Sequence, residues 1–154
     1  MPDGDVLYGR GPFRLARGAL LYAGAGAGLG AWSALNRLGW TDQCDAKITV
    51  SVLRKRLTPW HPSIRFYVNR NSRRERLNWA EVTVLEALTR IDFTEEPWLD
   101  CMEKLRSGVS ASRLGWGLPI RPEALRWAGE TETGCPDDLR YLLDDIARSL
   151  PETA

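Results

Sequence analysis

The sequence predicts a single mixed α/β domain of the α+β type, in which a small antiparallel sheet is packed with about five helices. Two short segments, Ile48–Leu53 and Ile64–Val68, carry β-branched and other apolar residues in strand-like alternation. The second half places apolar residues at helical spacing, most plainly between Leu139 and Leu150. A chain of 154 residues has the size of one domain and can bury a hydrophobic core without the help of disulfides or a bound metal.

The first forty residues are expected to form a loose arm followed by helices. Residues 1–11 are polar and punctuated by glycine, which favours an arm. Helices are expected over residues 12–40, with a break at Gly26–Gly30, because each glycine lowers helix propensity. These glycines do not fit a phosphate-binding loop, since their spacing is wrong and no clear strand precedes them.

Residues 46–69 are expected to form a β-hairpin. The connection at Leu57–Pro62 contains two prolines, and it is too short for a crossover helix, so antiparallel pairing is expected. A polar, arginine-rich loop, Asn69–Arg76, comes next. Residues 78–150 then form the helical half, in which Asn78 is a plausible cap. Its helices are expected over residues 79–90, 97–107, 121–131 and 136–150.

Composition and cysteine usage indicate a globular protein of the reducing cytoplasm. Hydrophobic residues make up 44% and charged residues 27% of the chain. The uncharged stretch Gly18–Asn36 has the length of a membrane span, but its glycines make it too weakly apolar, so no membrane partner is expected. Cys44, Cys101 and Cys135 are widely spaced and form no metal-binding pair, so neither a full set of disulfides nor a metal site is expected. No cofactor is expected either.

Charge is divided unequally between the two halves of the chain. Residues 1–78 carry 13 Lys/Arg and 5 Asp/Glu, whereas residues 79–154 carry 8 and 15. A basic half suits an anionic partner, and it can equally be neutralised by the acidic half of the same molecule. Both interpretations remain open from the sequence.

The basic residues that follow the first strand make the strongest candidate for a binding site. Guanidinium groups suit phosphate oxygens, and aromatic rings such as Trp60, Phe66 and Tyr67 can stack on bases. This pattern predicts contact with nucleic acid, with the alternative that the arginines pair with the acidic half. The candidate residues are Arg54, Lys55, Arg56, Arg65, Arg70, Arg73, Arg74 and Arg76.

No arrangement of carboxylates predicts catalysis. Asp45-Ala46-Lys47 before a strand is similar to half of a metal-dependent nuclease site, but its upstream acid has no clear strand. Glu81 and Glu86 have the spacing of exposed helix faces, with no histidine or cysteine beside them as a base or nucleophile. We therefore expect a protein that is not an enzyme.

One stretch resembles a known family. The residues that carry the likeness are Trp32-Ser33-Ala34-Leu35, then Leu38-Gly39-Trp40-Thr41-Asp42-Gln43, then Ile48-Thr49-Val50 and Arg54-Lys55-Arg56. Together they resemble the C-terminal domain of AbiE-type antitoxins, the transcriptional-regulator half of type IV toxin-antitoxin pairs. The similar part spans roughly residues 11–90 and includes the helix around Ala80–Leu88. The motif residues with an expected structural role are Ser33, Ala34, Leu35, Gly39, Trp40, Asp42 and Gln43.

The resemblance implies a cytoplasmic bacterial protein that counters a nucleotidyltransferase-like toxin and represses its own operon. We expect no counterpart of the family's N-terminal winged helix-turn-helix, because only about ten residues precede Gly11. Three hypotheses follow. The first is a non-enzymatic antitoxin-like or regulator-like domain that binds a toxin or another protein. The second is a nucleic-acid-binding module that uses Arg54–Arg76, with DNA as the partner, and the third is a metal-dependent nuclease that uses Asp45 and Lys47.

Overall fold

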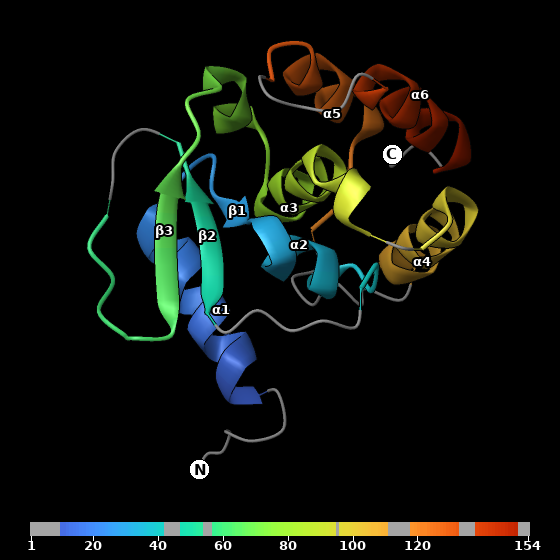
Figure 1. Cartoon of the computed structure of the whole chain (residues 1–154). Coiled ribbons are helices and arrows are strands. Elements are labelled where there is room, and N and C mark those ends of the chain that lie inside the picture. Colours follow the sequence, from blue (N-terminus) through green and yellow to red (C-terminus); the bar gives the residue numbers. More distant parts are fainter. Residues whose placement is uncertain are drawn as a thin grey trace.

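A computed structural model describes residues 10–41, 47–53, 57–94, 96–110, 118–132 and 138–150. The α+β fold is confirmed: within these residues there are six α-helices and a three-stranded mixed sheet, and the last three helices lie away from the sheet (Figure 1). The elements in chain order are α1 (Arg10–Ala23), β1 (Gly28–Leu29), α2 (Ala31–Arg37), β2 (Ile48–Val52), β3 (Ile64–Val68), η1 (Ser72–Arg76), α3 (Trp79–Thr89), η2 (Ile91–Phe93), α4 (Trp98–Ser110), α5 (Pro122–Gly129) and α6 (Leu139–Ser149), where η marks a 3-10 helix.

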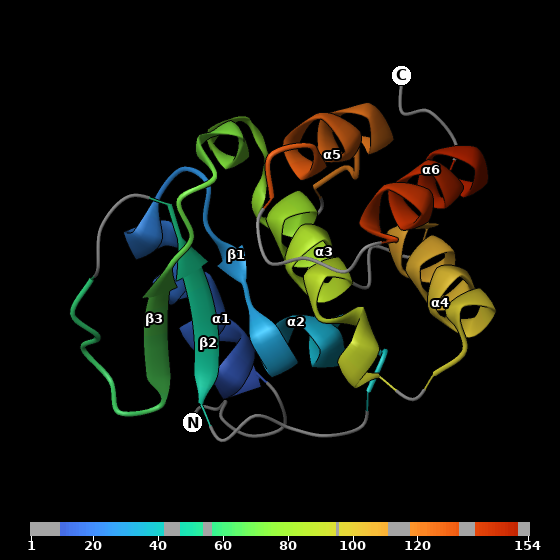
Figure 2. The same ribbon diagram turned by 45° about the horizontal axis from the view of Figure 1, so that its top comes forward.

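The sheet has the order β1-β2-β3, and the expected β-hairpin over residues 46–69 is wrong. β2 and β3 pair in parallel, with Ile48 opposite Ile64 and Val52 opposite Val68. The connection needs no helix: about ten extended residues reach roughly 35 Å, which exceeds the roughly 17 Å length of a five-residue strand. Residues 57–63 run beside the outer side of β3 in both views (Figures 1 and 2).

The antiparallel partner of β2 comes from the glycine run. Gly28 and Leu29 of β1 pair with Ser51 and Val50. The run also separates α1 from α2, because Gly24 and Gly26 adopt positive φ angles of 82° and 81° that end α1 and turn the chain. α1 begins at Arg10, slightly before the expected start after Pro12, and residues 1–9 of the expected arm lie outside the described residues.

The two faces of the sheet differ in polarity. On one face, Val50 and Phe66 lie toward α1, whose Tyr22 ring centre is 5.9 Å from that of Phe66. On the other face, Ser51 and Tyr67 point toward α3, as side chains one position along a strand must. One face therefore belongs to the apolar core and the other to a polar layer.

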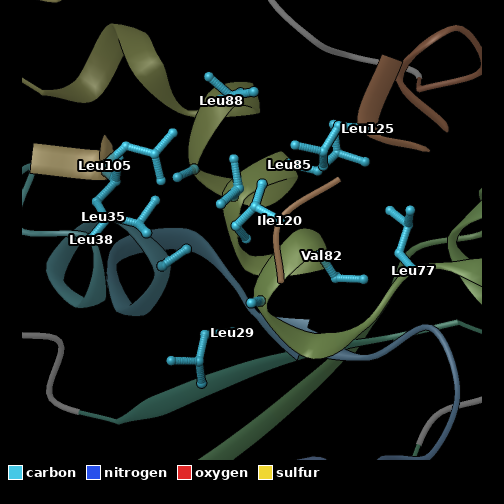
Figure 3. Packing of buried hydrophobic residues seen from close by; sticks show 14 of the residues in the cluster. Leu29, Leu35, Leu38, Leu77, Val82, Leu85, Leu88, Leu105, Ile120 and Leu125 are labelled. Atoms are coloured by element: carbon cyan, nitrogen blue, oxygen red, sulfur yellow. The ribbon is translucent and has the colours of Figure 1, made fainter. Parts of the chain in front are cut away.

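α3 lies at the centre of the molecule. Every residue from Ala80 to Leu88 is buried, including Glu81, Thr83 and Glu86. Its leucines pack against residues that follow it in the chain, with Leu125 of α5 near Leu85 (Figure 3). Polar side chains on a helix that is buried on all sides need hydrogen-bond partners, because burial without a partner costs free energy. The polar layer beside α3 supplies such partners. Within the described residues, no helix combines the length and apolar character needed to cross a bilayer.

Candidate functional site

The structure divides the arginine segment that was expected to bind nucleic acid. Arg54, Lys55 and Arg56 lie outside the described residues. Of the others, Arg65, Arg70 and Arg76 are exposed, whereas Arg73 is half-buried and Arg74 is fully buried. The segment is therefore no continuous basic surface over the part that the structure describes.

Arg74 is the centre of a buried ionic cluster. Its Nε and Nη2 donate to the two carboxylate oxygens of Glu132 at 2.7 and 2.9 Å. Its Nη1 donates to Glu86 Oε2 at 2.6 Å and to Ser51 Oγ at 3.1 Å. Burial alone would lower the pKa of Arg74, but the hydrogen bonds and charges of Glu132 and Glu86 raise it. Arg74 is thus a fixed cation inside the fold.

Neighbouring groups complete this cluster. The Tyr67 hydroxyl donates to Glu86 Oε1, and the Asn71 Nδ2 donates to Glu132 Oε2 at 2.6 Å. Thr131 donates in turn to Asn71 Oδ1 at 2.6 Å. Burial, followed by the charge and hydrogen bond of Glu86, raises the pKa of Tyr67, so the phenol keeps its proton and its donor role at neutral pH. Each acceptor is occupied from within, and this closed arrangement favours a structural role.

The expected exposure of Glu81 and Glu86 is wrong. Glu81 is buried because it serves two partners at once. It closes a capping box with Asn78 at the start of α3, and it receives Arg121 Nε and Nη2 at 2.8 and 2.7 Å. The Asn-x-x-Glu spacing from Asn78 to Glu81 is a signal for the cap in the sequence. Nothing local indicates that Arg121, forty residues later, would neutralise it.

Arg73 and Arg76 share one aromatic ring at the surface. Their guanidinium carbons lie 4.9 and 5.5 Å from the ring centre of Trp127 on α5. Arg73 also forms an ion pair with Glu130 at 2.7 Å. Arg73 and Arg74 therefore pair with acidic residues of the second half, as the second interpretation of the charge division holds.

Five of the seven motif residues with an expected structural role lie in the described part of the chain, in and just after α2. Ser33 Oγ accepts the backbone N–H of Thr49 at 3.0 Å and so joins α2 to β2. Ala34 and Leu35 are buried, and Gly39 ends the helix with a φ of 77°. Trp40 is buried, and its Nε1 donates to the carbonyl of Cys101 at 3.1 Å. Two further motif residues, Asp42 and Gln43, lie outside the described residues.

Large apolar side chains are exposed beside the N-terminal helix. Leu21, Tyr22 and Trp60 are 63%, 52% and 53% exposed, and we call this set the α1 aromatic surface. The rings of Tyr22 and Trp60 meet edge to face at 5.2 Å, and Tyr22 also contacts Phe66. Neighbouring exposed apolar groups of this size are typical of interaction sites. The hydrophobic pattern of the sequence does not indicate that Leu21 and Tyr22 would be left uncovered.

A groove opens next to this surface, between the end of α1 and the start of α3. Its volume is about 460 Å³, and we call it the α1–α3 groove. Apolar side chains and the backbone of the glycine turn form most of its wall. The lining residues are Arg17, Leu20, Leu21, Gly24, Ala25, Gly26, Leu77, Asn78, Trp79 and Leu118.

Groups suited to metal binding or nucleophilic catalysis do not gather in the described residues. No cluster of three or more His, Cys, Asp or Glu residues there could hold a metal ion. Of the nuclease-like pair, Asp45 lies outside the described residues and Lys47 is exposed. Burial raises the pKa of the Cys101 thiol to about 11, which leaves little thiolate at neutral pH.

Comparison with known proteins leaves the function to be argued from the chain itself. No family model matches the sequence, and neither the curated proteins nor the solved structures contain a match. The α1 aromatic surface, the α1–α3 groove and the exposed arginines are therefore the features from which a function can be proposed.

Proposed function

We propose that this chain is a non-enzymatic, antitoxin-like module of the transcriptional-regulator type, which acts in the cytoplasm by binding a protein partner, its cognate toxin. The α1 aromatic surface carries the proposal. Three large apolar side chains are exposed there next to one another, whereas the other exposed ones among the described residues, Leu99 on α4 and Tyr141 on α6, lie on separate helices. A partner that covered them would gain the free energy of removing tyrosine and tryptophan from water, and such residues dominate the energetics of interfaces.

The state of the polar groups supports binding over catalysis. Arg74, Glu86 and Glu132 are buried and bonded to one another. Glu81 is likewise held by Arg121 and by the capping box of α3. A general acid or base must instead reach a substrate from an accessible position. These carboxylates serve the stability of the fold, and this role supports binding over catalysis.

Co-expression with the toxin encoded beside its gene tests the proposal. Size-exclusion chromatography with light scattering should show a complex with the wild-type chain, and the Tyr22→Glu and Trp60→Glu variants should lose it. Tyr141→Glu is the matched control, because Tyr141 is 60% exposed on α6, away from this surface. A complex that survives both Tyr22→Glu and Trp60→Glu, or the absence of any complex with the wild-type chain, would overturn the proposal.

Nucleic-acid binding is the second candidate, and one arrangement favours it. Arg65, Arg70 and Arg76 remain exposed, and Arg76 lies over the ring of Trp127. Exposed guanidinium groups near an aromatic ring suit phosphates and unstacked bases. The salt dependence of DNA binding, measured with and without these arginines, tests this candidate.

A further inference from the structure

The α1–α3 groove has the size and the lining of a small-molecule site. Its volume of about 460 Å³ lies within the range of roughly 300–1,000 Å³ that is usual for such sites. Leu20 and Leu77 are buried residues of the lining, and Leu21 and Trp79 contribute further apolar wall. An apolar group that packed against this wall would be removed from water on the side that faces the wall.

One charged side chain lines the groove in the part of the chain that the structure describes. Arg17 is the charged residue of the lining, and it is exposed. No described residue forms an ion pair with it. The α1 sequence contains three arginines and no acidic residue, so its own helix offers Arg17 no partner either. An anionic group at the mouth of the groove would therefore meet a guanidinium that no described residue neutralises, and this group is the preferred donor for carboxylates.

The backbone at one wall depends on glycine. Gly24 and Gly26 have positive φ angles, and this turn leads the chain away from α1 toward β1. A Cβ added at Gly24 would meet nothing within 4 Å, so space is free beside this lining residue, and the groove itself opens to solvent. Entry therefore needs no movement of the core.

We propose that the α1–α3 groove binds a free amphipathic anion, a small molecule with an apolar chain or ring and one carboxylate or similar acidic group. The apolar part lies against the leucines and Trp79, and the acidic group pairs with Arg17. The inference goes beyond the proposed function, because it gives the chain a ligand site of its own beside the surface that meets a protein. A ligand bound there would contact Leu21 and so bear on both sites.

Isothermal titration calorimetry with dodecanoate, kept below its critical micelle concentration, tests the inference. Dodecanoate should bind the wild-type chain, and dodecyltrimethylammonium, with the same tail and the opposite charge, should bind at least tenfold more weakly. Removing the cation in Arg17→Ala should weaken dodecanoate by roughly five- to tenfold, the size expected for one partly exposed charged contact. The matched control is Arg140→Ala, since Arg140 is exposed on α6 and outside the groove.

Two further variants separate the groove from the rest of the surface. Ala25→Trp places a large ring at an exposed lining position and should reduce dodecanoate binding at least tenfold. Leu99→Trp, at an exposed position on α4, should leave it unchanged. All four substituted residues are exposed, and circular dichroism verifies that each variant is folded.

Three outcomes would overturn the inference. The first is an absence of dodecanoate binding, and the second is equal binding of the two detergents. The third is binding to anionic phospholipid vesicles without binding of monomeric dodecanoate, which would assign this face to a membrane surface. None of these results depends on the toxin, so they leave the proposed function to its own test.

Discussion

Arg73 and Arg74 are neighbours in the chain, yet their charges meet different surroundings. The Arg74 side chain is 0% exposed between Glu86 and Glu132, whereas Arg73 is 31% exposed and pairs with Glu130, which is 67% exposed. Removing a buried cation leaves its carboxylates without a counter-charge in a medium of low polarity. An exposed pair is screened by water and contributes little. Arg74 is therefore expected to affect the stability of the fold strongly, whereas Arg73 is expected to affect it little.

We predict that Arg74→Met lowers the free energy of unfolding by about 3–5 kcal/mol, because it leaves two buried carboxylates uncompensated. Arg73→Met, the matched control, should lower it by less than about 1 kcal/mol. Urea denaturation followed by circular dichroism measures both. Losses of similar size in the two variants would contradict the burial of the Arg74 cluster.

Tyr67, a member of the same cluster, makes the stability of the fold depend on pH in the alkaline range. Its pKa is raised in the folded chain, chiefly by burial and then by Glu86. Above about pH 10, the unfolded chain therefore releases this proton before the folded chain does, and the free energy of unfolding falls by up to about 1.4 kcal/mol per pH unit. Tyr67→Phe removes this contribution. Urea denaturation between pH 8 and pH 11 should show a shallower decline for the variant; equal slopes would contradict the prediction.

Residue burial in this cluster could not be predicted from the sequence. Glu81 and Glu86 lie on a helix, where charged residues are usually exposed. Their partners Arg121 and Arg74 are 40 and 12 residues away. Only the packing of α3 against all its neighbours determines that these carboxylates are enclosed. The cap at Asn78, by contrast, was visible as a local pattern.

At the scale of the elements, the strands were predictable and their pairing was not. The alternation that marks Ile48–Val52 and Ile64–Val68 is a local property, and both strands form where it lies. Strand direction depends on the path of the connection, and two residues such as Gly28 and Leu29 carry no period that could mark β1. The hydrophobic pattern therefore could not predict β1, the third strand of the sheet.

Close packing between β1 and α3 explains why glycine occupies position 28. A Cβ there would lie 2.6 Å from Val82 Cβ and 2.9 Å from the backbone nitrogen of Thr83. We predict that Gly28→Ala lowers the free energy of unfolding by about 2–3 kcal/mol through overpacking. Gly24→Ala is the control: space is free there, but φ is 82°, so a cost of about 1 kcal/mol is expected. Thermal unfolding ranks the two, and a larger loss for Gly24→Ala would contradict the close contact.

At the scale of the whole molecule, the acidic half neutralises part of the basic half. Arg73 pairs with Glu130 and Arg74 with Glu132, so these cations are engaged within the fold. The division of charge was visible in the sequence. The ion pairs that the charges form could not be predicted, because pairing across 57 or 58 residues depends on the fold. The structure therefore offers a few exposed cations and an apolar surface beside α1 as candidate sites, in place of one arginine segment.

DNA binding, where it occurs, should depend on the exposed arginines. We predict that changing Arg65, Arg70 and Arg76 together to Gln flattens the slope of log K against log salt by about 3, because each phosphate contact contributes roughly 0.9. Arg73→Gln should change the slope by less than about 0.5, since this arginine is paired. Fluorescence anisotropy of labelled duplex DNA between low and physiological salt measures both slopes. An equal effect of Arg73→Gln and the triple change would contradict this assignment.

Hydrogen–deuterium exchange of the chain alone and in complex with its toxin tests most directly whether the α1 aromatic surface is the partner site. Backbone amides of residues 15–23 and 57–66 should exchange more slowly in the complex. Amides of η1 and α5, which carry the Arg73 and Trp127 contact, should be unchanged. Protection confined to η1 and α5, with α1 unaffected, would contradict the account and assign the partner to the arginine side of the molecule.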